Sequence, residues 1–452
     1  MSDIQDSYNV SDRIEALSSE LGIHIPDIYL PSDLSYFPNW PVIACDQYTS
    51  SPDYWNKVRH RVEAAGNPSA YEIILPEIFL EEPGDIPLDK RISGINIMMR
   101  EYLDSSILTS RGRCMVFADR KTPHAQSRKG IVLAVDLDKY DFHDGSKALI
   151  RATEGTVLER IPPRLEIRKD AALEIPHVML LMDDPEDTVI GPLSAKFQTA
   201  GNTPIYDIEL PEGGGHITAH MISHNSRDAL DVLMAISQLR SLKEEGLLFA
   251  VGDGNHSLAT AKTHWENIRS SCAPDHPARY ALVEIVNIYD RGLTFEPIHR
   301  VLFGASPEEF AAFVKSRLPV EFGVEISDGM SLDNAMLMSS TIDPAVQPFT
   351  VFGKEHAMVM TCSSPPSAFT AGTAQHMIDS YIAAHPAARV DYIHGEDEVR
   401  ILSAKGTGIL LPPLHKEDFF GIIAERGSLP RKTFSMGEAD EKRFYMECRR
   451  II

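Results

Sequence analysis

A run of chemically active side chains, residues 252–257, connects an apolar segment to an amphipathic one. The apolar residues 247–251 predict a buried strand, and the residues after the run predict a helix. The free N–H groups and the dipole of a helix N-terminus attract anions, and glycines let a ligand approach the backbone closely. The run therefore predicts a binding site for a phosphate or a similar anion. Its members are Gly252, Asp253, Gly254, Asn255, His256 and Ser257.

The polar members of this run offer a base, a proton shuttle, an amide and a hydroxyl group. Asp253 is suited to act as a general base or a Mg²⁺ ligand, and His256 to move a proton. The alternative is a plain strand-to-helix turn, in which Asn255 or Ser257 only caps the helix. The run lacks the Gly-Lys-Ser/Thr ending of a Walker A loop, and it does not have the Rossmann glycine spacing.

Phosphoryl transfer needs positive charge near the phosphates and a carboxylate that accepts a hydroxyl proton. Candidate residues for these tasks lie along the rest of the chain: Arg164, Arg300 and Lys432 as phosphate partners, Thr433 beside them, Glu154 as a second carboxylate, His299 as a catalytic histidine, and Asp46 and Gln47 at the end of the predicted strand 42–45. Each also has an ordinary interpretation. The arginines suit surface ion pairs, His299 suits a packed core, and residues 427–437, which include Arg431, suit a solvated loop.

Several of these motifs carry a resemblance to a known family. The segment from Gly252 to Lys262 resembles the signature of the domain-of-unknown-function 1015 family, whose commoner form has Asp-Gly-His-His-Arg in this turn. The resemblance extends over most of the chain. It includes Glu154-Gly-Thr with Arg164, the stretch from Phe295 to Arg300, Asp46-Gln-Tyr and the stretch from Leu429 to Phe434. Asn255 and Ser257 depart from the family pattern, which indicates a divergent branch without the arginine of this turn.

More distantly, the Asp-Gly-x-His turn is similar to the ParB and sulfiredoxin-like superfamily. That resemblance implies a ParB/sulfiredoxin-like core elaborated with additional sheet and helices, and nucleotide phosphates held at a helix start. Some members phosphorylate free serine, so it also implies ATP or ADP with Mg²⁺ and a free amino acid (serine) kinase as the most concrete activity. The alternative is a non-enzymatic regulatory protein that binds a nucleotide or metabolite and uses the same turn as a sensor.

Hydrophobic periodicity predicts an α+β protein with mixed α/β order. The helices are expected at 12–21, 91–103 and 227–243. The strands are expected at 42–45, 114–118, 129–136, 177–182, 216–223, 247–251 and 280–288, with a hairpin at 349–352 and 357–360. We expect three regions, 1–145, 146–330 and 331–452, with weak boundaries that also permit one intertwined unit.

Three histidines at four-residue intervals, His216, His220 and His224, raise the possibility of a zinc site. On a strand they would span about 26 Å, which is too far for one ion. Polar and apolar residues alternate here, so a strand is favoured and the metal is left unassigned.

Composition limits the class of protein. The 452 residues carry 43 basic and 65 acidic side chains, a net charge of −22, which disfavours binding to nucleic acid or anionic lipid. The five cysteines form no C-x-x-C pair, and no apolar stretch is long enough for a spanning helix or a secretory signal. We therefore expect a cytoplasmic protein with a small-molecule substrate and leave its oligomeric state open.

Overall fold

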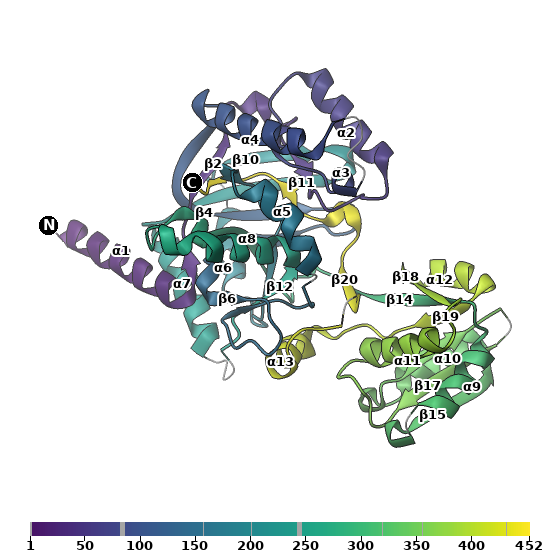
Figure 1. Cartoon of the computed structure of the whole chain (residues 1–452). Coiled ribbons are helices and arrows are strands. Elements are labelled where there is room, and N and C mark those ends of the chain that lie inside the picture. Colours follow the sequence, from purple (N-terminus) through teal and green to yellow (C-terminus); the bar gives the residue numbers. More distant parts are fainter. Residues whose placement is uncertain are drawn as a thin grey trace. The chain divides into compact units, whose positions relative to one another are not determined.

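The structure is a computed structural model that describes residues 2–81, 86–156, 158–199, 201–241, 246–318, 320–354, 356–430 and 432–452 (Figure 1). Its contacts divide the chain into two compact units, Met1–Leu293 with Gly437–Ile452, and Thr294–Met436. Both units combine helices with sheets, so the predicted α+β class is confirmed. The boundaries that the sequence suggested at 145 and 330 lie inside these units, and the three-region division stays a prediction. Arg431 lies outside the described residues.

The first unit is built around one large sheet. Among the described residues its strands follow the order β10-β11-β4-β5-β13-β9-β12-β7-β6, with β1 on β5 and β2 on β4. The strands are β1 Ile23–His24, β2 Asp27–Pro31, β4 Leu108–Lys121, β5 Arg128–Asp136, β6 Tyr140–Asp141, β7 Ile150–Arg151, β9 Met179–Met182, β10 Tyr206–Leu210, β11 Gly215–Ser223, β12 Phe249–Asp253 and β13 Tyr280–Asn287. The predicted strands at 114–118, 129–136, 216–223, 247–251 and 280–288 are confirmed.

Apolar side chains cover both faces of this sheet. In β5, Ile131 and Leu133 pack into one buried cluster, while Val132 between them packs into another. The first cluster takes residues of the helices α1 (Ser2–Leu21), α6 (Ile190–Phe197), α7 (Arg227–Ser241) and α8 (Asn255–Ile268). The second takes residues of the helices α2 (Pro52–Ala65) and α4 (Leu88–Asp104). A strand buried on both faces needs apolar residues at every position, which explains the uninterrupted apolar run at 131–135.

The helices of the first unit follow the amphipathic segments. They are α1 Ser2–Leu21, α2 Pro52–Ala65, α3 Ile78–Glu81, α4 Leu88–Asp104, α5 Ile161–Arg168, α6 Ile190–Phe197, α7 Arg227–Ser241 and α8 Asn255–Ile268. The predicted helices at 12–21 and 91–103 are confirmed as parts of α1 and α4. The helix predicted at 227–243 is α7 as far as residue 241, and residues 242–245 lie outside the described part. Helices α5 and α8 lie side by side (Figure 1).

The last segment of the chain, residues 437–452, completes the first unit. Its strand β21, Phe444–Tyr445, pairs with β3, Val42–Ile43, and its strand β22, Arg449–Arg450, pairs with β8, Leu173–Glu174. Arg443 is buried between Glu284 and Glu447, with a nitrogen 2.5 Å from an oxygen of each carboxylate. The segment is therefore part of the core of the first unit.

The second unit has its own sheet and core. Its described strands follow the order β15-β17-β16-β19-β14-β18, with β20 on β14. They are β14 Phe295–Phe303, β15 Val324–Met330, β16 Phe349–Phe352, β17 Ala357–Cys362, β18 Arg389–His394, β19 Thr407–Leu410 and β20 Phe434–Met436, with helices α9 Pro307–Arg317, α10 Leu332–Thr341, α11 Thr370–Ala384, α12 Glu396–Leu402 and α13 Lys416–Arg426. The predicted hairpin is confirmed, because β16 and β17 pair antiparallel with Val351 opposite Met358.

Candidate functional site

The turn between β12 and α8 has the strand-turn-helix form that the sequence predicts. Strand β12 ends at Asp253 and α8 begins at Asn255. Gly254 between them has a φ of +84°, and a Cβ at this position would lie 3.0 Å from the Cα of Val178. Gly254 is also the N-cap residue of α8 and has no side chain with which to cap the helix. Neither Asn255 nor Ser257 is therefore the cap residue.

Asp253 links this turn to the last segment of the chain. One carboxylate oxygen, Oδ1, accepts a hydrogen bond of 2.9 Å from the N–H of Gly254. The other, Oδ2, lies 3.3 Å from Nζ of Lys442, and the side chains are 25% exposed for Asp253 and 15% exposed for Lys442. A positive and a negative group thus stand together at the N-terminus of a helix, in partial contact with solvent.

His177, just before β9, is the centre of a second group of contacts. Its Nε2 lies 3.0 Å from Oγ of Ser257 and 3.6 Å from Oδ2 of Asp46. Its Nδ1 lies 2.8 Å from the hydroxyl oxygen of Tyr445, which also accepts a hydrogen bond of 3.1 Å from the N–H of Cys45. The imidazole is therefore fixed on both nitrogens by residues that are distant in the sequence.

Asp46 is held in its ionised form. Burial opposes ionisation of this carboxyl, but the His177 ring, the Gln47 amide and the Lys442 ammonium outweigh it and keep the pKa of Asp46 below its ordinary value. The amide of Gln47 donates a hydrogen bond of 2.9 Å to Oδ1 of Asp46. Gln47 thus contributes to the site by orienting the Asp46 carboxylate and favouring its ionised form.

The segment that carries Glu154 lies next to the turn. The side-chain oxygen of Asn255 accepts a hydrogen bond of 3.3 Å from the N–H of Thr153, and the Thr153 hydroxyl donates one of 2.6 Å to the carbonyl of Val251. Glu154 follows directly. The structure thus brings Glu154 and Asp46 into the neighbourhood of the turn.

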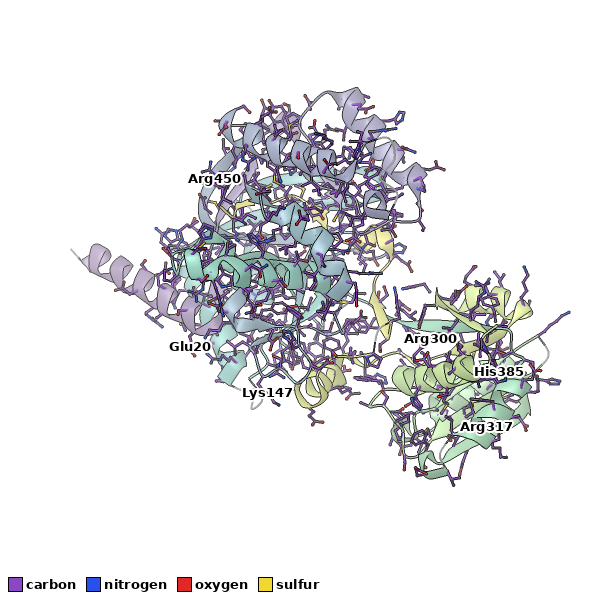
Figure 2. All side chains as sticks on the ribbon, viewed as in Figure 1. Glu20, Lys147, Arg300, Arg317, His385 and Arg450 are labelled. Atoms are coloured by element: carbon purple, nitrogen blue, oxygen red, sulfur yellow. The ribbon has the colours of Figure 1, made fainter. Side chains whose placement is uncertain are left out.

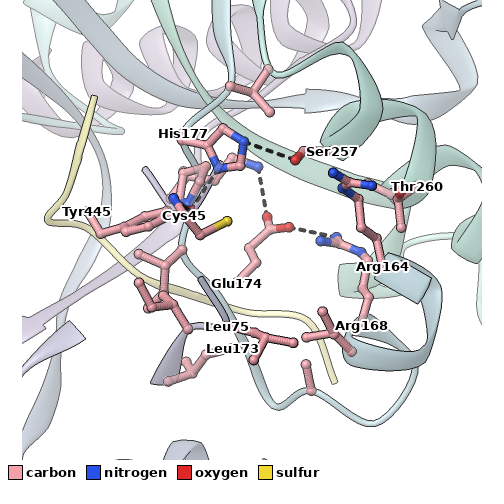
Figure 3. Close-up of a pocket in the computed structure, with 18 of the residues that line it drawn as sticks. Cys45, Leu75, Arg164, Arg168, Leu173, Glu174, His177, Ser257, Thr260 and Tyr445 are labelled. Atoms are coloured by element: carbon pink, nitrogen blue, oxygen red, sulfur yellow. Dashed lines mark hydrogen bonds and ion pairs between the residues drawn. The ribbon is translucent and has the colours of Figure 1, made fainter. Parts of the chain in front are cut away.

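A mainly apolar cavity of about 170 Å³ opens beside His177 and Ser257 (Figure 3). Its apolar wall includes Ile73, Leu75, Leu80, Met99, Leu173, Leu258, Ala261 and Leu282. The charged residues of the wall are paired. Arg164, from α5, forms an ion pair with Glu77, and Arg168 lies 2.6 Å from Glu174. Arg164 therefore lines this cavity with its charge balanced by a carboxylate.

Four of the residues predicted for the site belong to the second unit: His299, Arg300, Lys432 and Thr433. Arg300 is labelled in Figure 2. It is fully buried, donates from Nε to the side-chain oxygen of Gln375 at 3.1 Å, and has its Cζ 4.9 Å from the centre of the Tyr392 ring. Thr433 donates to the carbonyl of Pro430 at 2.5 Å and lines a separate cavity of about 490 Å³. Lys432 has a φ of +59°. A shared site of these four with the turn stays a prediction.

His299 should make the stability of the second unit depend on pH. Its Nδ1 accepts a hydrogen bond of 3.1 Å from the N–H of Leu411, and burial, with Arg300 and His394 nearby, lowers its pKa from 6.5 to about 4. The unfolded chain therefore binds this proton more readily, and the stabilisation is present above pH 6.5 and lost between pH 6.5 and 4. The loss amounts to roughly 3 kcal/mol. Urea unfolding of the protein and of His299→Gln at pH 7 and pH 4.5 measures it. An unchanged pH dependence in the variant would contradict this.

The three histidines considered for zinc lie in or next to β11, as the alternation predicts. His216 contacts Asp207 at 2.6 Å and Glu209 at 2.9 Å, and the His220 ring stacks on that of Phe197. Within the described ranges, no three His, Cys, Asp or Glu side chains are grouped so that they could hold a metal ion. In the same ranges, no helix has the length and hydropathy needed to cross a membrane.

Sequence reasoning missed three members of the site, His177, Lys442 and Tyr445. A local signal existed for His177, because it follows Pro176 and lies two residues before the apolar strand β9. Asp46 has a comparable position, three residues after β3. Lys442 and Tyr445 gave no such signal, since nearly 190 residues separate them from Asp253 and Ser257. Only the return of the chain to the first unit brings them there.

Comparison with known proteins gives a family and a set of remote structural neighbours. No curated protein matches the sequence. Among solved structures, a free serine kinase in complex with AMP has a TM-score of 0.38 and 11% identity, over 70% of this chain and 90% of that one. A variant of free serine kinase in complex with ADP has a TM-score of 0.39 and 9% identity, over 70% and 91%. A conserved hypothetical protein from Pyrococcus furiosus has a TM-score of 0.36 and 10% identity, over 71% and 94%.

Likeness at this level carries no argument about the site or its reaction. The sequence comparison is more specific. The model of the family described as "Protein of unknown function (DUF1015)" matches residues 29–381, which is more than three-quarters of the chain. The match includes the turn at 252–257 and the segments around Asp46, Glu154 and Arg300. The chain therefore belongs to the DUF1015 family.

Proposed function

We propose that the first unit binds a nucleotide or phosphorylated metabolite at the N-terminus of α8 and transfers or hydrolyses a phosphoryl group. One observation carries the proposal. The Asp253–Lys442 pair and the Ser257–His177–Asp46 contacts lie together at the N-terminus of α8. Backbone N–H groups and a lysine suit phosphate oxygens, while the carboxylates suit a hydroxyl proton. Phosphoryl transfer requires both kinds of group, positive charge beside the phosphates and a base for the acceptor hydroxyl.

Asp253 is the proposed base. Its carboxylate is a quarter exposed, which lets an acceptor hydroxyl reach it, and its bond to the Gly254 N–H fixes its orientation. Lys442, 3.3 Å away, and the first turn of α8 supply the positive charge that the transferred phosphoryl group needs.

Mg²⁺ would enter with the nucleotide. This ion is commonly held by one or two carboxylates together with substrate phosphates. Glu154, next to the Thr153 that bonds Asn255, is the carboxylate that we propose would hold this ion, with Asp253 as the base. Bound there, Mg²⁺ would neutralise phosphate charge.

The acceptor is proposed to place an apolar group in the 170 Å³ cavity. Its charged wall residues are balanced, with two arginines opposite two glutamates, and the remaining wall is mostly aliphatic. A dry apolar cavity of about 150 Å³ binds benzene. A hydroxyl compound with a ring or a branched chain thus fits better than serine itself.

Filling the cavity should therefore prevent binding of an apolar probe. Leu80 lines the cavity and is only partly buried, so Leu80→Trp can fill the space from the rim. We expect benzyl alcohol, followed by saturation-transfer NMR, to bind this variant at least about tenfold more weakly. Ile97→Trp, at a position that is 55% exposed on α4, is the matched control and should bind as the unchanged protein does. Equal binding by both variants would place the probe elsewhere.

Phosphorus NMR of the protein with ATP, Mg²⁺ and a pool of amino acids and hydroxy compounds tests the proposed function. A new phosphomonoester signal would identify a small-molecule kinase, and inorganic phosphate alone would identify a hydrolase. An unchanged spectrum would contradict phosphoryl transfer from ATP. Nucleotide binding without turnover, seen as a thermal shift, would then favour a non-enzymatic regulatory protein.

A further inference from the structure

Ser257 and His177 have the geometry of a nucleophile and its base. The Ser257 hydroxyl lies in the first turn of α8, and its Oγ is 3.0 Å from Nε2 of His177. Both side chains line the 170 Å³ cavity, where Figure 3 shows them facing each other. A serine hydroxyl is a weak nucleophile until an adjacent base takes its proton, and hydrogen-bond contact with a fixed imidazole is the usual arrangement.

The other nitrogen of His177 determines which tautomer is present. The Tyr445 hydroxyl oxygen accepts the N–H of Cys45 at 3.1 Å and lies 2.8 Å from Nδ1 of His177, within reach of a proton on that nitrogen. In the tautomer that carries its proton on Nδ1, Nε2 has the free lone pair and faces the Ser257 hydroxyl at 3.0 Å. This is the tautomer that a general base for Ser257 requires.

Asp46 completes the arrangement by stabilising the charge that forms. Its Oδ2 lies 3.6 Å from Nε2, close enough to favour an imidazolium once His177 has accepted a proton. The Gln47 amide and Lys442 keep this carboxylate ionised. The positive end of α8 also favours negative charge that develops beside Ser257.

We propose that Ser257 is a covalent nucleophile that His177 activates and that takes the phosphoryl group in the reaction proposed above. In the first step Oγ of Ser257 forms a bond to phosphorus, the bond from phosphorus to the nucleotide oxygen breaks, and the hydroxyl proton passes to Nε2 of His177. In the second step the acceptor hydroxyl attacks phosphorus and gives its proton to Asp253. The bond from phosphorus to Oγ then breaks, and Oγ regains the proton from His177.

A fluorophosphonate probe tests the nucleophile without any nucleotide. Attack by Ser257 forms the bond from Oγ to phosphorus and releases fluoride, while His177 takes the proton. We expect peptide mass spectrometry to find the label on Ser257, and no label there in Ser257→Ala. In His177→Gln, labelling should slow by about 10²–10⁴-fold, as expected for the loss of a general base. If His177→Gln does not fold, Asp46→Asn gives the second test, with labelling slowed about tenfold or more.

Ser306→Ala is the matched control. The Ser306 hydroxyl caps α9 by accepting the backbone N–H of Glu309 at 3.2 Å, so its loss should leave labelling of Ser257 unchanged. A folded protein in which Ser257 stays unlabelled would overturn the proposal.

ATP separates this inference from the proposed function on which it rests. With ATP, Asp253→Asn should accumulate one phosphoryl group on Ser257, since the second step lacks its base. Undiminished ATP consumption by Ser257→Ala would overturn the covalent step and leave phosphoryl transfer intact. Labelling of Ser257 by the probe without any consumption of ATP would support the nucleophile and count against the proposed donor.

Discussion

Replacing Asp253 by asparagine is expected to lower the rate of phosphoryl transfer by about 10²–10⁴-fold, the usual contribution of a general base. Asparagine keeps the oxygen that accepts the Gly254 N–H, so the turn should retain its shape. The charge opposite Lys442 is lost, and no group in its place can take the acceptor proton. Nucleotide affinity, measured by calorimetry, should change little, because N–H groups and lysine bind the phosphates.

The control for this prediction is an aspartate–lysine pair at another helix start. Asp228, in the first turn of α7, lies 2.5 Å from Nζ of Lys196. Asp228→Asn removes a similar charge outside the turn and should keep full activity. Full activity of Asp253→Asn in the phosphorus NMR assay would show that the base is another group, with Glu154 the next to replace.

The second large effect concerns stability. Arg443→Met should destabilise the first unit by about 3–5 kcal/mol, because Glu284 and Glu447 would be left as buried carboxylates without their partner. In the native protein burial opposes ionisation of Glu284, yet the guanidinium of Arg443, together with Arg128 and Arg120, outweighs this and holds the pKa of Glu284 below its ordinary value. Without Arg443, the carboxylates should take up protons, so the penalty should shrink as the pH falls toward 4.

Urea unfolding followed by tryptophan fluorescence measures this effect. Arg227→Met is the control, since Arg227 and Asp231 form an exposed pair one helical turn apart with side chains at least half exposed. Its loss should change stability by less than about 0.5 kcal/mol. Equal midpoints for the two variants would contradict a structural role of the buried ion pair.

The fold class and the turn could be predicted because their signals are local. The apolar run before Asp253, the glycine at a left-handed position and the amphipathic segment after it are all contained in about 20 residues. The alternation in 216–223 likewise identified a strand and argued against one metal ion on three histidines. Such patterns depend on hydrophobic periodicity and backbone preferences, which act over one element.

The composition of the site could not be predicted in full, because it depends on contacts between distant segments. Tyr445 reaches His177 only after β21 has paired with β3, which no local pattern encodes. His299 and Arg300 carried the same kind of signal as Asp46, namely polar residues near an apolar strand, yet they belong to the other unit. Residue type and strand ends thus identify candidates, and topology decides which of them meet.

The first unit consists of two segments of the chain that the second unit separates in the sequence, and this arrangement affects folding during synthesis. Residues 294–436 form the second unit, and only afterwards does the ribosome produce residues 437–452, whose strands and buried Arg443 the first unit needs. At about 5–20 residues per second, the first 293 residues wait roughly 8–31 s for their last partner strands. During this interval β3 and β8 lack their pairing edges. The nascent chain should therefore depend on chaperones more than an uninterrupted domain of equal size, and the second unit should be the first to become protease-resistant.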